Sequence, residues 1–341
     1  MYETVGRTFW ENLRSRGKAI ALWTTDEDGD GVPDAISSVR LQSMAAQVAI
    51  GFIGLEMGPG DRVLVHGPMG PEAVLVSLAA WMIGAVTVHA DPDMPEAMLG
   101  EALTRAKPSW IVVPTPGALA DLELASGDSL AQAHVVVLGS APKDPVPRIT
   151  PFADVKALGR KNRATGIAPL ATAVFAVPKE ARAAILYWRR KSSGDMGAAA
   201  LTHEDLLAGL GTLPKPWGIS VSDRVLLTVH SGTRTGLFAM LQLLDAGCGL
   251  LLTAADAQAV KPTLLVTTAA GMDQLIAEVE AVMDGKLTSI VRERLGAERD
   301  PARELNRHLG KSLRLAWCLD APGHNVKGVF ERAGIQLVET P

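Results

Sequence analysis

Short, continuous runs of Val, Ile and Leu recur along this chain and constrain its fold more than any other feature. They lack the polar–apolar alternation of a half-exposed strand, so they are typical of parallel sheets covered on both faces. The expected strands are 61–67, 85–90, 110–113, 134–139, 183–188, 224–229, 249–253, 263–268, 313–319 and 335–338. Helical patterns lie between them at 41–53, 71–83, 96–106, 202–210, 236–245 and 275–283. This order predicts an α/β fold of two lobes, with mostly parallel sheets flanked by helices.

The length of 341 residues is enough for about two domains. We expect a first lobe over 1–165, with an N-terminal hairpin and helix, and a second lobe over 166–341. The stretch 140–169 is rich in Pro, Lys and Arg and weakly periodic, so it is expected to be a linker or a long surface excursion. The polar stretch 284–310 is expected to form exposed helices.

Composition excludes several classes of protein. A net charge of −4 gives no electrostatic footprint for nucleic-acid binding. The two cysteines, Cys248 and Cys318, have no CxxC spacing, which argues against a disulfide framework or a cysteine zinc site and fits the reducing cytoplasm. The N-terminus has no apolar segment typical of a secretory signal. Residues 73–90 carry no charge, but a buried helix running through Gly84 into a buried strand explains them as well as a membrane span does.

One segment carries a recognisable pattern. It reads AAILYWRRKSSGDMGAAALTHEDLLAGL over 183–210, and Thr202 with Asp205 gives its last part a capping-box-like helix start. The segment resembles the phosphate-loop region of the adenylate-forming superfamily, which includes the acyl-CoA synthetases. Other segments resemble that family in the same order: 58–67, 81–95, 223–252 and 334–337. The resemblance covers the family's large N-terminal domain and implies its fold.

The expected phosphate loop departs from the family pattern. A loop that grips phosphates needs small residues, because backbone N–H groups must approach the ligand. Here the bulky residues Trp188, Arg189, Arg190 and Lys191 fill its first half, and only Ser192, Ser193 and Gly194 keep its character. Asp195-Met196 stands where the family has Pro-Lys. The sequence ends at Glu339-Thr340-Pro341 without the family's aromatic-Gly-x-Thr-Glu motif, β-barrel subdomain or mobile C-terminal domain.

These departures favour a non-catalytic member, a binding or assembly module with no catalytic residue, metal or cofactor expected. Its ligand-binding residues would be Arg189, Arg190, Lys191, Ser192, Ser193 and Gly194, as an anion site for a phosphate, CoA or an acidic partner surface. A solvated charge run on a surface loop is the plainer interpretation. We expect a protein partner or a homo-oligomer, with an acyl or CoA-like small molecule as a further ligand, and neither nucleic acid nor a membrane span.

Two alternatives stay open. The first is a ligase that activates a carboxylic acid with ATP and Mg²⁺ to an acyl-AMP or an acyl-CoA, either through a divergent loop or with missing parts supplied by a partner chain. The second is a purely structural interaction module. Pyrophosphate exchange and thermal-shift titration distinguish these alternatives.

A few further motifs carry weaker signals. Asp26–Asp34 places Asp at positions 1, 3, 5 and 9 of a calcium-loop pattern, but Ser37 replaces the closing Glu, so a solvated acidic turn is favoured. The resemblance implies a structural role for His203 and a place near an acyl pocket for His230. The other histidines, at 66, 89, 134, 308 and 324, have no metal-ligand spacing. Gly310-Lys311-Ser312 lacks the upstream Gly of a P-loop, since residue 305 is Leu.

Overall fold

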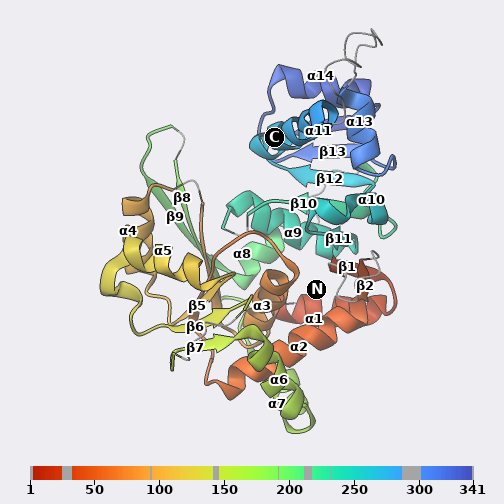
Figure 1. The fold of residues 1–341 in the computed structure, drawn as a ribbon. Coiled ribbons are helices and arrows are strands. Elements are labelled where there is room, and N and C mark those ends of the chain that lie inside the picture. Colours follow the sequence, from red (N-terminus) through yellow and green to blue (C-terminus); the bar gives the residue numbers. More distant parts are fainter. Residues whose placement is uncertain are drawn as a thin grey trace. The chain divides into compact units, whose positions relative to one another are not determined.

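The computed structural model describes residues 3–24, 33–92, 94–140, 146–190, 192–210, 217–230, 232–285 and 301–339 (Figure 1). The chain forms two compact units. The first comprises Met1–Ala19, Ser37–Thr212 and His230–Asp245, and the second comprises Ile20–Ile36, Leu213–Val229 and Ala246–Pro341. Each unit is built on one seven-stranded sheet, which confirms the predicted α/β class.

The sheet of the first unit has the strand order β7-β6-β5-β3-β4-β8-β9. Its strands are β3 (Arg62–Val65), β4 (Val86–Ala90), β5 (Trp110–Val113), β6 (His134–Val137), β7 (Ile149–Pro151), β8 (Arg182–Arg189) and β9 (Met196–Thr202). All neighbours pair in parallel except β9, which returns antiparallel along β8. The carboxyl ends of the parallel strands therefore meet at one edge, where α/β folds bind ligands.

Helices cover both faces of this sheet. They are α1 (Val5–Arg16), α2 (Ser38–Gly54), α3 (Pro71–Met82), α4 (Glu96–Ala106), α5 (Pro116–Ser126), α6 (Phe152–Lys161), α7 (Arg163–Ala176), α8 (His203–Ala208) and α9 (Arg234–Ala246). One core packs α4 and α5 against strand side chains such as Leu64, Val88 and Ile111. Helix α3 packs against β3 and β4 and is covered in turn by α2.

The uncharged segment 73–90 is internal to this unit. Helix α3 ends at Met82, Gly84 takes a positive φ of 77°, and the chain continues directly into the fully buried β4. The expected buried helix followed by a buried strand is confirmed. Within the described residues, no helix is long and apolar enough to cross a membrane.

The second unit has the strand order β14-β13-β12-β10-β11-β1-β2. The strands are β1 (Ile20–Thr24), β2 (Asp34–Ser37), β10 (Arg224–Thr228), β11 (Gly249–Leu251), β12 (Leu264–Thr267), β13 (Leu315–Cys318) and β14 (Gln336–Glu339). Its helices are α10 (Ala257–Val260), α11 (Ala269–Gly285), α13 (Pro301–His308) and α14 (His324–Arg332). They bury one sheet face in a core that includes Leu265, Met272 and Phe330.

Three expectations differ from this architecture. The stretch 140–169, expected to be a linker or a long surface excursion without regular structure, contains β7, α6 and the first half of α7. The two compact units also differ from the lobes expected over 1–165 and 166–341, because β8 pairs with β4 and so joins 182–202 to the first sheet. The N-terminal strands expected in the first lobe, β1 and β2, belong instead to the second sheet, where β1 pairs with β11. In the polar stretch 284–310, the described helix α13 is not simply exposed, since Ala302 and Leu305 are buried in the core.

Candidate functional site

The β8–β9 hairpin forms the region that resembles a phosphate loop in sequence. The last two residue pairs of its antiparallel ladder are Trp188 with Gly197 and Arg189 with Met196. The Trp188 ring lies against Gly197, where an added Cβ would overlap the indole. A glycine is therefore required at this position by the ring on the neighbouring strand.

The tip of this hairpin is closed by its own hydrogen bonds. The Arg190 N–H donates to the Asp195 carbonyl over 2.8 Å, and the Gly194 N–H donates to the Arg190 carbonyl over 2.8 Å. The Asp195 N–H donates to Ser193 Oγ over 3.3 Å. Gly194 has a φ of 79°, which a side chain would strain. Three N–H groups that could otherwise face a phosphate are already paired within the loop.

The predicted ligand-binding residues that the structure describes lie together in this turn, with exposed side chains. Arg189, Arg190, Ser192 and Ser193 are exposed, and Gly194 is half-buried; Lys191 lies outside the described residues. This arrangement presents guanidinium groups to solvent, and such groups bind phosphate and carboxylate groups well.

Three loops are joined beside the hairpin, at the carboxyl edge of the same sheet. His230, in the loop before α9, forms an isolated antiparallel bridge with Pro68, which follows β3. Gly232 lies so close to the Ala90 carbonyl, at the end of β4, that a Cβ there would overlap it. The Asp91 N–H donates to the Tyr187 carbonyl of β8 over 3.0 Å.

Two histidine rings lie together at this edge. The centroids of His66 and His230 are 5.9 Å apart, with the rings edge to face. The Gly232 N–H donates to His230 Nδ1 over 2.9 Å, which fixes that nitrogen as an acceptor. Burial lowers the pKa of His66, and the Asp121 carboxylate only partly opposes this shift. The sequence gives no signal for His66, because only the topology brings it to His230.

His203 has the structural position that the resemblance implies. The capping box expected from Thr202 and Asp205 is formed at the start of α8. The His203 ring is fully buried, and its Nδ1 accepts a hydrogen bond from the Val5 N–H over 3.3 Å. Burial lowers its pKa to about 4. The neutral ring therefore ties α8 to the start of α1.

No metal site is found in the part of the chain that the structure describes. No group of three or more His, Cys, Asp or Glu residues there is arranged to hold an ion. Most of the candidate calcium loop, Asp26–Asp34, lies outside the described residues, and Asp34 itself begins β2.

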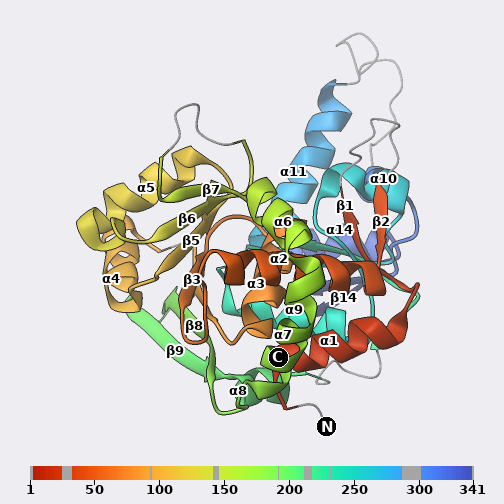
Figure 2. The same cartoon turned by 90° about the horizontal axis from the view of Figure 1, so that it is seen from below.

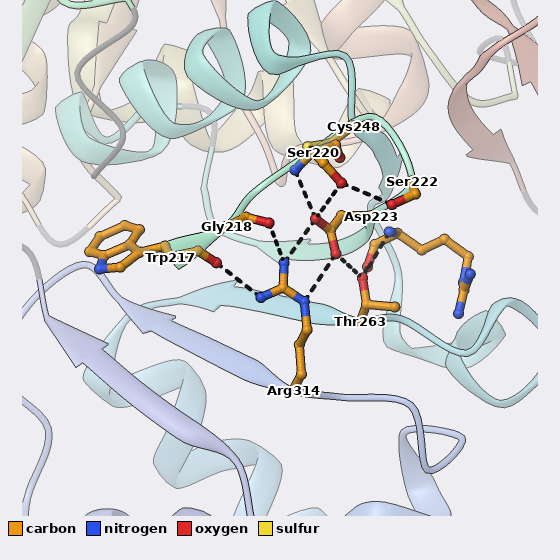
Figure 3. Close-up of polar contacts among 9 residues, drawn as sticks. Trp217, Gly218, Ser220, Ser222, Asp223, Cys248, Thr263 and Arg314 are labelled. Atoms are coloured by element: carbon orange, nitrogen blue, oxygen red, sulfur yellow. Dashed lines mark hydrogen bonds and ion pairs between the residues drawn. The ribbon is translucent and has the colours of Figure 1, made fainter. Parts of the chain in front are cut away.

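The second unit contains a dense polar cluster, which we call the Asp223 clamp (Figure 3). Asp223 accepts hydrogen bonds from Arg314 Nη2 (2.9 Å), Thr263 Oγ1 (2.7 Å) and the Ser220 N–H (2.9 Å). Arg314 also donates to the carbonyls of Trp217 and Gly218, each over 3.0 Å. Burial alone would raise the pKa of Asp223, but the bonds from Arg314, Thr263 and Ser220 outweigh it and lower the pKa.

The clamp has a structural role. Thr263, Asp223 and Arg314 directly precede β12, β10 and β13, so they lie at the amino edge of a parallel sheet, away from the usual ligand edge. Asp223 is only 5% exposed, and its carboxylate is satisfied by neighbours. The clamp holds the loop 217–223 against the sheet.

Comparison with known proteins identifies the family. The family model described as AMP-binding enzyme matches residues 9–322, most of the chain. The chain belongs to the AMP-binding enzyme family. An acetyl-coenzyme A synthetase from Pseudoalteromonas atlantica is 40% identical to it over 76 residues, which are 22% of this chain and 12% of that protein.

Two solved ligase structures have the same fold. The anthranilate CoA ligase AuaEII, in complex with anthranoyl-AMP, aligns with a TM-score of 0.69 at 17% identity and covers 98% of this chain and 58% of its own. The acetoacetyl-CoA synthetase from Streptomyces lividans aligns with a TM-score of 0.69 at 17% identity, over 99% of this chain and 51% of its own. The chain thus spans little more than half the length of these two structures.

Proposed function

We propose that this AMP-binding family member is a binding module that does not form acyl-adenylates by itself. Its ligand would be anionic and would bind at the exposed cations of the β8–β9 hairpin. A phosphate-bearing small molecule of the CoA type fits these cations, as does an acidic surface of a partner protein.

The closed hairpin tip is the observation that supports this proposal. Adenylation requires positioned donors that stabilise negative charge as pyrophosphate leaves. The N–H groups of Arg190, Gly194 and Asp195 donate within the tip, and the Asp195 carboxylate adds a negative charge beside them. To bind a triphosphate, the loop would have to break these bonds and move the Trp188 ring from Gly197.

Pyrophosphate exchange with a panel of carboxylic acids tests the catalytic half of the proposal. We expect no exchange above background from the purified chain with Mg²⁺ and ATP. A variant in which Trp188, Arg189 and Arg190 are replaced by Thr, Ser and Gly is the matched comparison, because it restores small residues without changing the length. Robust exchange by the natural chain would refute the proposal.

Thermal-shift titration tests the binding half. A ligand at a hundredfold excess over its Kd stabilises the folded state by about 2.7 kcal/mol. We expect stabilisation by CoA or an acyl-CoA, and its loss in the double variant R189A/R190A. The matched control is R303A/R307A, which removes two cations from α13. Equal stabilisation of the natural chain and R189A/R190A would place the ligand elsewhere.

The joined loops around His230 favour ligase activity as a second candidate. The bridge to Pro68 and the approach of Gly232 to Ala90 hold an ordered site edge although the hairpin tip is closed. In that case a partner chain would supply the missing catalytic groups. Pyrophosphate exchange that appears only when co-purifying proteins are added back would support this candidate over the first.

A further inference from the structure

A basic stretch without acidic residues lies between β7 and β8. Between Asp154 and Glu180 no Asp or Glu occurs. The basic residues of this interval are Lys156, Arg160, Lys161, Arg163 and Lys179. Four of them lie on α6 or at the start of α7, within a chain whose net charge is −4. Positive charge is therefore concentrated in this stretch, although the protein as a whole carries a net negative charge.

Helix α6 packs closely on a neighbouring helix, which places Arg160 and Lys161 on its exposed side. It packs against α2 by close backbone approaches: a Cβ at Gly159 would overlap the Gln47 carbonyl, and one at Gly51 would overlap the Val155 carbonyl. The Gln47 side chain also donates to the Lys156 carbonyl over 2.6 Å. With this face of α6 buried, Arg160 and Lys161 are exposed.

These cations are not neutralised by neighbours. Among the described residues, no carboxylate lies within ion-pair distance of Arg160, Lys161 or Arg163. Arg163 donates instead to the Ser43 hydroxyl over 2.9 Å. The positive charge is thus available to an external anion.

Helix α7 adds an uncharged exposed face directly after the cations. No charged residue occurs over 164–178. Leu170 and Val174 are buried against the unit. The Arg7 guanidinium lies 4.6 Å from the centroid of the Phe175 ring and also pairs with the Glu3 and Glu11 carboxylates, and Phe175 remains 47% exposed. Apart from Arg163, the other exposed side chains of α7 are Ala164, Thr165, Ala168, Pro169, Thr172 and Ala176. Figure 2 shows α6 and α7 in front of α2 and α3, at the surface of the first unit.

We propose that the α6–α7 hairpin docks on the surface of an anionic lipid bilayer. Arg160, Lys161 and Arg163 would lie among the headgroup phosphates, while Phe175 and the small residues of α7 would contact the interfacial layer. A nucleic acid would use the cations and leave the uncharged face of α7 without a partner, whereas a bilayer interface accommodates both. The helices lie on the membrane and do not span it.

Vesicle co-sedimentation tests this proposal with the full chain. We expect binding to vesicles of equal phosphatidylcholine and phosphatidylglycerol at low salt, and none to pure phosphatidylcholine. Each cation near an anionic surface contributes about fivefold in the partition constant, so R160A/K161A should bind about 25-fold more weakly. Raising the salt from 0.01 to 0.15 M should weaken binding, because the screening length falls from about 30 to about 8 Å.

Matched variants distinguish the α6–α7 surface from the rest of the molecule. R303A/R307A removes two exposed cations from α13 and should bind vesicles like the natural chain, and F175A should lose a few-fold in binding. Circular dichroism melts establish that the variants fold. Failure to bind anionic vesicles, equal binding by R160A/K161A, or binding of a DNA duplex in preference to the vesicles would each overturn the proposal.

Discussion

The tip of the β8–β9 hairpin and the Asp223 clamp are both polar loops closed by internal hydrogen bonds, but they use different groups. In the clamp, side-chain charges are paired: Asp223 and Arg314 bond each other and the loop around them. In the hairpin tip, mainly backbone groups are paired, and the Arg189 and Arg190 side chains remain exposed. The first arrangement stabilises the fold, while the second leaves two guanidinium groups exposed to solvent.

Removing the clamp arginine should give the largest effect on stability. Arg314→Ala leaves the buried Asp223 carboxylate without its main partner, so we expect the free energy of unfolding to fall by about 2–4 kcal/mol. Urea denaturation measures this. Arg105→Ala, which removes only an exposed i,i+4 pair with Glu101, should change the free energy of unfolding by less than about 0.5 kcal/mol. Similar losses in the free energy of unfolding for the two variants would show that the clamp stabilises the fold no more than an exposed ion pair does.

Acid titration should separate the two units. The folded pKa of His203, about 4, lies below its ordinary value of 6.5, so the neutral ring stabilises the fold above pH 6.5 and this stability is lost as pH falls toward 4. Lowering the pH from 7 to 5 should reduce the contribution of His203 to the free energy of unfolding by about 2 kcal/mol. The pKa of Asp223 is lowered from 3.8, so the clamp stays ionised throughout that range.

Denaturation of the natural chain and His203→Gln at both pH values measures this contribution. The glutamine variant should lose the His203 part of the pH dependence and retain that of the other histidines, including His66 and His134. Identical pH slopes for the two proteins would show that His203 is not a buried neutral group.

Adding a methyl group beneath the Trp188 ring should open the hairpin tip and lower the free energy of unfolding moderately. A Cβ at Gly197 would overlap the indole, so Gly197→Ala should destabilise the chain by about 1–2 kcal/mol and shift the tryptophan fluorescence. Gly58→Ala is the matched control, because nothing lies near its added Cβ and its φ is not positive. An unchanged emission spectrum with unchanged stability would mean that the ring does not pack on Gly197.

Removing the exposed cations should have the smallest effect on stability. In R189A/R190A the tip keeps its backbone hydrogen bonds, so we expect a change within about 0.5 kcal/mol in urea denaturation. A loss of more than about 2 kcal/mol in the free energy of unfolding would instead show that these arginines stabilise the fold, as Arg314 does in the clamp.

Local signals predict much of this structure, and long-range packing determines the rest. The apolar run Trp110–Val113 and the Thr202–Asp205 capping box are predicted at the correct residues, because their causes lie within a few positions. Helices α6 and α7 are missed because Gly159 and Pro169 resemble breaks. Gly159 is in fact required by the close approach of α2, and Pro169 is tolerated inside α7. The pairing of His66 with His230 depends on topology and has no local signal.

Amide hydrogen exchange at the hairpin tip, followed by NMR with and without Mg²⁺ and ATP, tests the central claim most directly. In the structure, the N–H groups of Arg190, Gly194 and Asp195 already donate hydrogen bonds within the loop. We predict that these amides exchange slowly in the free protein and that millimolar nucleotide changes neither their rates nor their chemical shifts. Rapid exchange in the free protein, with protection appearing when ATP is added, would contradict the account.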